Sequence, residues 1–193
     1  LKNHSFMNAL IKLDHALFGV LNQDWHNSLF DAWMPFMRNP QFWAPLYFFL
    51  IIFSLFNFGK QKWWWILFAA LTAIITNYIS SDLVKEHIIR LRPCNNPQMS
   101  DTVRFLLNYR PQSSSFTSSH AANHFGLATF LYFTLKNRYG KWPLIFFAWA
   151  FIIGYAQIYV GVHFPLDIVG GTLIGLVFGY LPASIFNKYY GLS

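Results

Sequence analysis

The feature that most constrains the fold is a series of apolar segments long enough to cross a lipid bilayer. Residues 41–58 read QFWAPLYFFLIIFSLFNF, and a transmembrane helix needs about 17 to 25 such residues. Further apolar segments cover residues 63–79, about 119–135, 142–160 and about 166–185. Only 11% of the residues are charged, whereas a soluble domain has about 25%. The sequence therefore predicts an all-α, polytopic membrane helix bundle with about five transmembrane helices.

The first 38 residues have a different, mixed pattern. Apolar side chains recur at helical spacing from Phe6 to Leu21, but Lys12 and Asp14 interrupt any full span. This pattern predicts one or two amphipathic helices lying at the membrane interface. A docked transmembrane helix is the less favoured alternative. We therefore expect an N-terminal interfacial segment over residues 1–38 and a transmembrane domain over residues 39–193.

The distribution of basic residues predicts the orientation in the membrane. Three segment ends on one face are basic, and the positive-inside rule assigns that face to the cytoplasm; the residues are Lys60, Lys62, Lys136, Arg138, Lys141 and Lys188. The opposite face receives residues 85–120 and the turn at 160–167. Four arginines violate the rule by lying on this outer side, which suggests an anionic ligand there; they are Arg90, Arg92, Arg104 and Arg110.

The net charge of +7 and the single cysteine say little more about the class of protein. The basic residues are scattered over short loops and form no stripe with exposed aromatic residues, so nucleic acid is not an expected partner. Cys94 alone cannot form an internal disulfide framework.

Close helix packing is expected near the C-terminus, where small residues recur at Gly170, Gly171, Gly175 and Gly179.

The second apolar segment leads into the first group of candidate site residues. It begins with an expected interfacial belt, Trp63 to Trp65, and continues into the polar sequence SSDLVKEHIIRLRP, where Pro93 should end the helix. Lys85 and Arg92 would then lie two helical turns apart and point the same way. Two such cations suit a phosphate group, which arginine can bind in a bidentate manner.

Two more candidate groups reach the same membrane face. Ser118 or Ser119 is an expected N-cap, and the free backbone N–H groups of the helix that begins there, beside His120, favour an anion. His163 and Asp167 are four residues apart at the junction of two membrane-length segments. The carboxylate can fix the tautomer of the imidazole, which is what a nucleophilic histidine needs.

These motifs resemble those of the type 2 phosphatidic acid phosphatase superfamily of membrane lipid phosphatases, which is related in active-site pattern to vanadium haloperoxidases. That family carries K-x6-R-P, then P-S-G-H, then S-R-x5-H-x3-D. The corresponding residues here are Lys85 with Arg92-Pro93, Thr117-Ser118-Ser119-His120, and Ala156-Gln157 with His163 and Asp167. The resemblance covers about residues 63–185 and departs from the pattern at four positions, Thr117, Ser119, Ala156 and Gln157.

The resemblance implies metal-independent, cofactor-free hydrolysis of a lipid phosphate or diphosphate. His163 would attack phosphorus to form a phosphohistidine, Asp167 would orient it, and His120 would act as general acid and base. The phosphate oxygens would be bound by Lys85, Arg92, Ser118, the backbone around Ser119, and Gln157. The expected partners are the lipid phosphate substrate and membrane lipids, with no obligate protein partner evident. The orientation predicted from the basic residues would place the site on the extracytoplasmic face of a bacterial-type cytoplasmic membrane.

The serious departure is Gln157, because an amide brings no charge to the position where the family has arginine. One hypothesis is that Arg104 or Arg110, in the long loop at residues 94–117, supplies the missing cation. Replacing Arg110 with Ala should then lower turnover far more than a typical loop substitution does.

Other readings of the same residues stay open from the sequence alone. Lys85 and Arg92 could be interfacial anchors, and His163 with Asp167 could be a polar pair at a helix end. His120 and His124 could hold a metal with that pair, although no HExxH signature supports such a site. A transporter or channel for an anionic substrate would use the same few charges, but their gathering at one membrane face favours an enzyme over a transporter or a purely structural protein.

Overall fold

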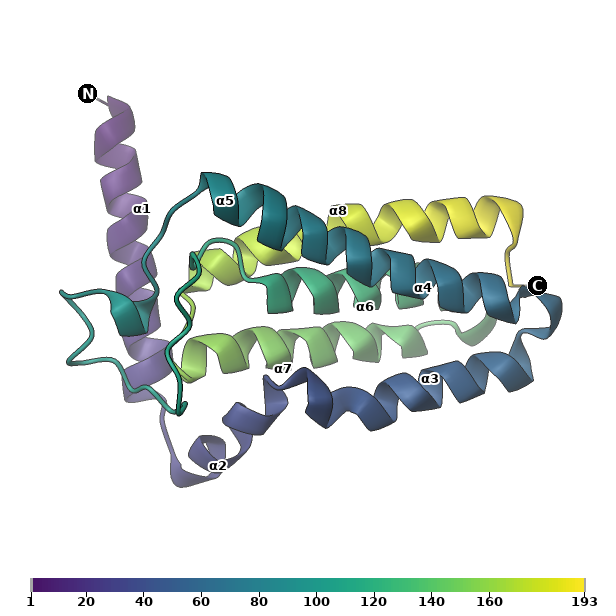
Figure 1. Ribbon diagram of the computed structural model, residues 1–193, viewed down its shortest axis with the longest axis horizontal. Coiled ribbons are helices and arrows are strands. Elements are labelled where there is room, and N and C mark those ends of the chain that lie inside the picture. Colours follow the sequence, from purple (N-terminus) through teal and green to yellow (C-terminus); the bar gives the residue numbers. More distant parts are fainter. Residues whose placement is uncertain (1, 193) are drawn as a thin grey trace.

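The computed structural model describes residues 2–192, which form eight α-helices and no strand. The long helices α3 (Ala44–Asn57), α4 (Lys62–Asn77), α6 (Ser119–Tyr139), α7 (Ile145–Tyr159) and α8 (Pro165–Tyr189) lie roughly parallel in one bundle (Figure 1). The short helices α2 (Ser28–Met37) and α5 (Lys85–His87) lie at one end of this bundle. Helix α1 (Lys2–Gly19) lies at the same end and runs across the bundle axis.

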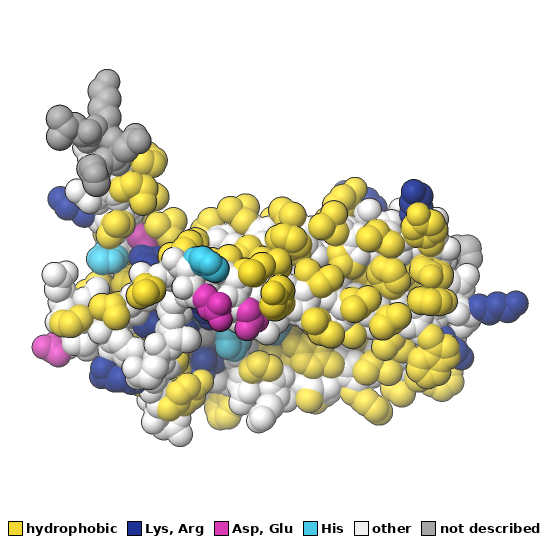
Figure 2. Space-filling view, turned by 45° about the horizontal axis from the view of Figure 1, so that its top comes forward, with side chains coloured by type: hydrophobic (Ala, Val, Ile, Leu, Met, Phe, Trp, Pro, Cys, Tyr) yellow, Lys and Arg dark blue, Asp and Glu magenta, His cyan; other side chains and the backbone are white. Residues whose placement is uncertain are grey.

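The lengths and hydropathy of the helices identify a multi-pass membrane protein. Among residues 2–192, four helical stretches are long and apolar enough to cross a membrane, namely Pro40–Asn57, Gly59–His87, Trp142–Tyr159 and Pro165–Tyr189. Hydrophobic side chains cover most of the bundle on the face drawn in Figure 2, as expected for a surface solvated by lipid. The fifth expected span corresponds to α6, which has 21 residues and a more polar sequence.

Helix α6 tolerates this polarity because it lies at the centre of the bundle, packed against α4, α7 and α8. Its contact with α8 depends on small residues. A Cβ atom at Gly171 would lie 2.4 Å from the Ser118 carbonyl oxygen, and one at Gly179 would lie 2.3 Å from the Gly126 carbonyl oxygen. Gly175 approaches the α6 backbone in the same way. The predicted close packing by these three glycines is confirmed, and α6 is shielded from lipid by it.

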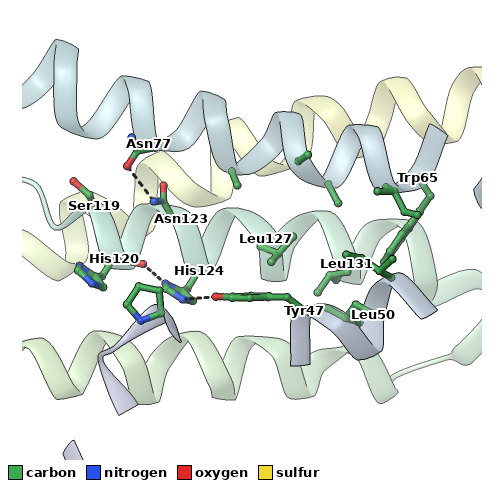
Figure 3. Close-up of a pocket in the computed structure, with 16 residues that line it drawn as sticks. Tyr47, Leu50, Trp65, Asn77, Ser119, His120, Asn123, His124, Leu127 and Leu131 are labelled. Atoms are coloured by element: carbon green, nitrogen blue, oxygen red, sulfur yellow. Dashed lines mark hydrogen bonds between the residues drawn. The ribbon is translucent and has the colours of Figure 1, made fainter. Parts of the chain in front are cut away.

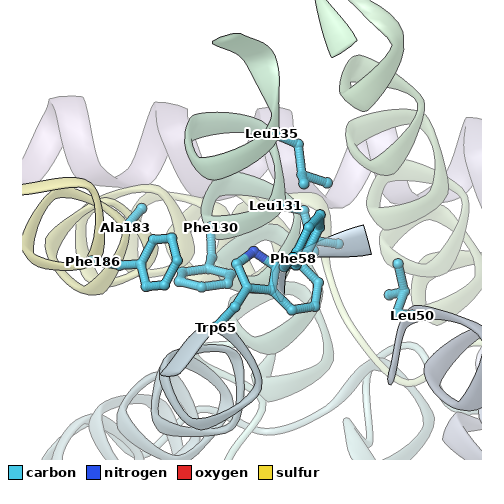
Figure 4. Close-up of a cluster of buried hydrophobic side chains, with 8 residues drawn as sticks. All are labelled: Leu50, Phe58, Trp65, Phe130, Leu131, Leu135, Ala183 and Phe186. Atoms are coloured by element: carbon cyan, nitrogen blue, oxygen red, sulfur yellow. The ribbon is translucent and has the colours of Figure 1, made fainter. Parts of the chain in front are cut away.

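A cluster of buried apolar side chains closes the end of the bundle away from α1 (Figure 4); its members are Leu50, Phe58, Trp65, Phe130, Leu131, Leu135, Ala183 and Phe186. The expectation that Trp63 to Trp65 all form an interfacial belt is wrong for Trp65, which is 2% exposed and donates a hydrogen bond to Thr134. Consecutive residues of a helix point in directions about 100° apart. Trp63 and Trp64 are exposed, and Trp65 faces the core.

The helix that carries Lys85 ends earlier than the sequence suggested. A π-helical stretch, Tyr78–Val84, follows α4, and the chain leaves helical geometry at Ile88, which has φ −116° and ψ 101°. The interpretation that Lys85 and Arg92 share one face of a continuous helix is therefore wrong. Five residues of non-helical chain precede Pro93, so the two cations reach the site from different directions.

The N-terminal segment is fastened to the bundle by buried polar side chains. Asp14 accepts a hydrogen bond from the Leu166 backbone N–H at 2.8 Å and pairs with Arg90. Asn22, in the π-helical turn Val20–Asp24, is fully buried and donates to the Tyr159 carbonyl oxygen at 2.7 Å. Other side chains of α1 leave a set of exposed apolar residues, which are Phe6, Met7, Ile11, Leu13 and Leu17. The segment thus buries Asp14, Phe18 and Asn22 against the bundle and leaves apolar side chains exposed elsewhere.

Candidate active site

The turn between α7 and α8 positions His163. The Gln157 carbonyl oxygen accepts hydrogen bonds from the backbone N–H groups of Val162 and His163, at 3.1 and 3.3 Å. The chain reverses at Gly161, whose φ of +84° is a conformation that favours glycine. Pro165 then opens α8 at its first turn, where a missing N–H costs nothing. The His163 side chain is consequently held in the protein interior, with 2% of the residue exposed.

The neighbours of the His163 ring determine which nitrogen carries its proton. Arg92 Nη1 lies 3.1 Å from Nε2 of His163. A guanidinium can only donate, so Nε2 must be the unprotonated nitrogen. Nδ1 therefore bears the proton, and it lies 3.4 Å from Asp167 Oδ2. Burial lowers the pKa of His163 to about 4, against the opposing effect of the hydrogen bond with Asp167. The ring is neutral at pH 7, and the unprotonated Nε2 accepts the hydrogen bond from Arg92.

Asp167 is fully buried and is fixed by several donors. Its Oδ2 accepts a hydrogen bond from the Phe164 backbone N–H at 2.8 Å, which makes it part of the N-terminal cap of α8, and another from the Ser115 hydroxyl. Its Oδ1 accepts from Arg90 Nη1 at 2.6 Å. Arg90 also pairs with Asp14 of α1. A chain of charged contacts thus runs from the N-terminal helix to Asp167, whose Oδ2 lies 3.4 Å from His163 Nδ1.

Arg92 is held by the long loop and the histidine turn. Its guanidinium donates to the Ser113 carbonyl oxygen at 2.9 Å, to the Ser113 hydroxyl at 3.0 Å and to the Val162 carbonyl oxygen at 3.1 Å. The charge of Lys85 acts on His163 together with that of Arg92, so both predicted cations lie near the histidine. The structure thus brings both residues to the same histidine, although the helical geometry assumed for them was wrong.

The start of α6 has the predicted capping geometry. The Ser118 hydroxyl accepts a hydrogen bond from the Ala121 N–H at 3.4 Å, and the Ser118 N–H donates to the Asp167 carbonyl oxygen at 3.0 Å. The second bond places the start of α6 directly beside the start of α8. The Ser119 hydroxyl contacts Ser80 and Ser81, at 3.1 and 2.8 Å, and so fastens the end of the α4 segment.

His120 lies where two cavities meet. One cavity, of about 580 Å³, lies between α3, α4 and α6 and is mostly apolar; Figure 3 shows His120 and Ser119 at one end of it and Leu131 and Trp65 at the other. The second, of about 570 Å³, is lined by His120 together with Arg38, Tyr109 and neighbouring residues. His124 lies one helical turn after His120 on α6 and is fixed by hydrogen bonds to the His120 carbonyl oxygen and to the Tyr47 hydroxyl. His124 therefore supports the cavity wall.

The predicted substitute cations lie elsewhere. Arg104 is paired with Asp31 at 2.7 Å, and Arg110 donates to the Cys94 carbonyl oxygen. The arginine that contacts Gln157 is Arg38, whose Nε lies 3.3 Å from Gln157 Oε1. The hypothesis that Arg104 or Arg110 replaces the charge at Gln157 is therefore wrong. Both are occupied by partners of their own.

Three residues of the site, Arg38, Ser113 and Ser115, were missed from the sequence, and Arg90 was noted only as one of four arginines on the predicted outer side. A signal for Arg38 existed, because it precedes the span 41–58 on the predicted outer side and so is a further basic residue that violates the positive-inside rule. For the serines the sequence carries no comparable signal. Within residues 2–192, no group of three or more His, Cys, Asp and Glu side chains is placed to hold a metal ion.

The fold and the site define a class of protein: a polytopic membrane enzyme with a buried, carboxylate-supported histidine and clustered cations at one end of a helix bundle. Its family follows from comparison with known proteins. The sequence pattern of the PAP2 superfamily matches residues 62–190. The chain belongs to this superfamily and is a membrane phosphatase, as the resemblance in the motifs predicted.

Individual relatives agree with this assignment. The lipid A 4'-phosphatase of Bacteroides thetaiotaomicron is 34% identical over 167 residues, which cover 84% of this chain and 72% of the relative. The undecaprenyl-diphosphatase BcrC of Bacillus subtilis is 28% identical, over 93% of this chain and 81% of the relative. The crystal structure of Aquifex aeolicus LpxE has a TM-score of 0.67 and 27% identity, and the match covers 89% of this chain and 95% of that chain.

Proposed function

We propose that this chain hydrolyses a lipid phosphate or diphosphate monoester through a phosphohistidine on His163. The observation that carries the proposal is the state of the His163 ring. Nδ1 bears its proton beside Asp167, and Nε2 has its electron pair directed at the guanidinium of Arg92. A phosphate group bound by Arg92 would therefore meet the nucleophilic nitrogen.

The proposed reaction has two steps. In the first, the Nε2 electron pair forms a bond to phosphorus, the bond from phosphorus to the lipid oxygen breaks, and His120 gives a proton to the leaving oxygen. In the second, water attacks the phosphohistidine, His120 takes its proton, and the N–P bond breaks to release phosphate. Lys85, Arg92, Ser118, the Ser119 backbone and Gln157 would bind the nonbridging oxygens, whose charge must be stabilised in the transition state.

Two features support a lipid substrate. The apolar cavity between α3, α4 and α6 ends at His120, where the polar cavity begins. An amphiphile could place its tail in the first and its phosphate in the second. Two relatives are named as a lipid A 4'-phosphatase and an undecaprenyl-diphosphatase, and the substrates in both names are lipids that carry phosphate groups. We infer that the substrate belongs to this class of lipid phosphates.

The proposed location is the extracytoplasmic face of a bacterial-type cytoplasmic membrane. The turn between α3 and α4 and the last turn of α6 lie at the end of the bundle with the C-terminus, opposite the end that carries α1 and the long loop (Figure 1). These segments carry the basic residues Lys60, Lys62 and Arg138. The positive-inside rule assigns the basic end to the cytoplasm. The site would then open on the outer side.

The proposal is tested by phosphate release from a panel of lipids in detergent micelles: lipid A, undecaprenyl diphosphate, phosphatidylglycerophosphate and phosphatidate. Wild-type protein should release phosphate from at least one of them in the presence of EDTA. His163→Ala should abolish release, and the matched control His26→Ala, at an exposed position outside the site, should not. Loss of activity in EDTA would contradict a metal-independent mechanism, and no release from any of the lipids would contradict the proposal.

A further inference from the structure

Gln157 has an unusual environment for an uncharged residue of α7. It is fully buried, and its Oε1 accepts a hydrogen bond from Arg38 Nε at 3.3 Å. Because arginine can only donate, this contact fixes the orientation of the amide and leaves Nε2 as the free donor. Nε2 is buried and has no hydrogen-bond partner in the described part of the chain. A buried donor without a partner costs about 1 to 3 kcal/mol, so its position favours an acceptor that binds there.

Among residues 2–192, Arg38 is the only basic residue whose side chain makes a hydrogen bond with Gln157, and it comes from the N-terminal segment. It follows α2 directly, is 9% exposed, and donates from Nη1 to the Tyr109 hydroxyl at 3.3 Å. Arg38 and His120 line the same polar cavity. The N-terminal segment therefore carries a guanidinium to the cavity that holds the proposed general acid.

The charge of Arg38 lacks a protein counter-ion. Arg90 is paired with Asp14 and Asp167, and Arg104 is paired with Asp31. Within residues 2–192 no carboxylate lies within salt-bridge distance of Arg38, and the same is true of Arg92. A buried charge is costly unless it is paired. Two buried arginines without carboxylates, Arg92 at His163 and Arg38 in the cavity of His120, point to an anion between them.

We propose that Arg38 is a catalytic residue that binds the transferring phosphoryl group and supplies the positive charge that Gln157 lacks. This inference rests on the proposed function and extends it. The family pattern has its arginine on α7 at position 157; here the arginine lies outside the region matched by the family pattern, residues 62–190, and Gln157 holds it by its amide oxygen. The amide Nε2 of Gln157 adds a second donor to the same phosphate.

The test compares arginine variants by two measurements. The first is the kcat and KM of phosphate release from the lipid substrate, and the second is the affinity for orthovanadate, measured as the shift of thermal unfolding in detergent. Arg38→Gln should lower kcat about 100-fold or more, the scale seen when a transition-state donor is removed, and should weaken orthovanadate binding at least about tenfold. Arg38→Lys keeps the charge but loses the planar guanidinium group, so its kcat and orthovanadate affinity should lie between those of the wild type and of Arg38→Gln.

Rescue by an exchanged pair separates a catalytic role from a structural one. The double variant Arg38→Gln with Gln157→Arg places the charge where the family has it. Its kcat should be at least about tenfold higher than that of the single variant Arg38→Gln. The matched control is Arg138→Gln at the opposite end of the bundle, where the side chain donates to the Asn57 carbonyl oxygen. This control should keep wild-type kcat and orthovanadate affinity.

The inference and the proposed function can fail separately. Wild-type kcat and wild-type orthovanadate affinity in a folded Arg38→Gln protein would overturn the inference while leaving the lipid phosphatase intact. An equal loss of kcat and orthovanadate affinity in Arg110→Gln would also overturn it. Arg110 donates to the Cys94 carbonyl oxygen and has no proposed role in binding the anion, so an equal loss there would show that the effect is not specific to Arg38. If no lipid is hydrolysed by the wild type, the proposed function fails, and the orthovanadate affinities still decide whether Arg38 binds the anion.

Discussion

The contact between Asp14 and Arg90 should control how firmly the N-terminal segment is docked, and its loss can be estimated from the structure. The Asp14 side chain is fully buried and the Arg90 side chain is 21% exposed. Asp14→Asn keeps an oxygen that can accept from the Leu166 N–H but removes the charge-assisted bond to Arg90. A hydrogen bond to a charged group contributes about 1.5 to 3 kcal/mol. Since Arg90 retains Asp167 and some solvent, we take about 2 kcal/mol for the loss.

This value predicts a measurable change in local opening. A loss of about 2 kcal/mol raises the population of the undocked segment about 30-fold, because 1.4 kcal/mol is a factor of ten. Hydrogen exchange of the amides in residues 14–24 should accelerate by this factor, since exchange reports local opening. The matched control is Asp24→Asn, at an exposed position of the same segment. Unchanged exchange in Asp14→Asn, or equal acceleration in both variants, would show that the contact with Arg90 does not hold the segment in place.

Three further predictions concern other parts of the molecule. Gly179→Ala should destabilise the contact of α6 and α8 by about 1 to 3 kcal/mol, because the new Cβ would lie 2.3 Å from the Gly126 carbonyl oxygen. The loss should appear as a lower unfolding temperature. The control Gly19→Ala, whose Cβ would meet nothing within 4 Å, should leave this temperature unchanged. NMR of ¹⁵N-labelled histidine should show His163 neutral from pH 7 to 5, since burial lowers its pKa to about 4, whereas a histidine peptide titrates near 6.5. Stability should consequently fall as the pH drops from about 6.5 toward 4, because the unfolded chain then binds a proton that folded His163 does not; equal stability over this range would contradict the assignment.

The sequence predicted the parts of the site that lie within short motifs. His163 and Asp167 share one turn and one helix start, so their spacing alone brought them together. Ser118 was correctly expected to cap a helix because its chemistry is local. The spans were predicted from hydropathy, and α6 was placed among them although its sequence is more polar, since its length still fits a membrane.

The parts that sequence reasoning missed depend on contacts between distant segments. Arg38 and Gln157 are 119 residues apart, and Arg90 and Asp14 are 76 apart. No periodicity or local motif relates such pairs, and their meeting is decided by how the N-terminal segment packs on the bundle. The early end of the helix at His87 was missed for a different reason. The sequence between it and Pro93 is compatible with a helix, and tertiary contacts such as the hydrogen bond from the Ser115 N–H to the Arg90 carbonyl oxygen override that preference.

The most direct test of the account is to trap the phosphorylated enzyme. Rapid quenching of a lipid substrate labelled with ³²P in its terminal phosphate should give a protein adduct that is stable in base and labile in acid, as an N–P bond is, located on the peptide that contains His163. The adduct should be absent from His163→Ala. An adduct on a different residue, or turnover with no covalent label at any quench time, would contradict the claim that His163 Nε2 is the nucleophile.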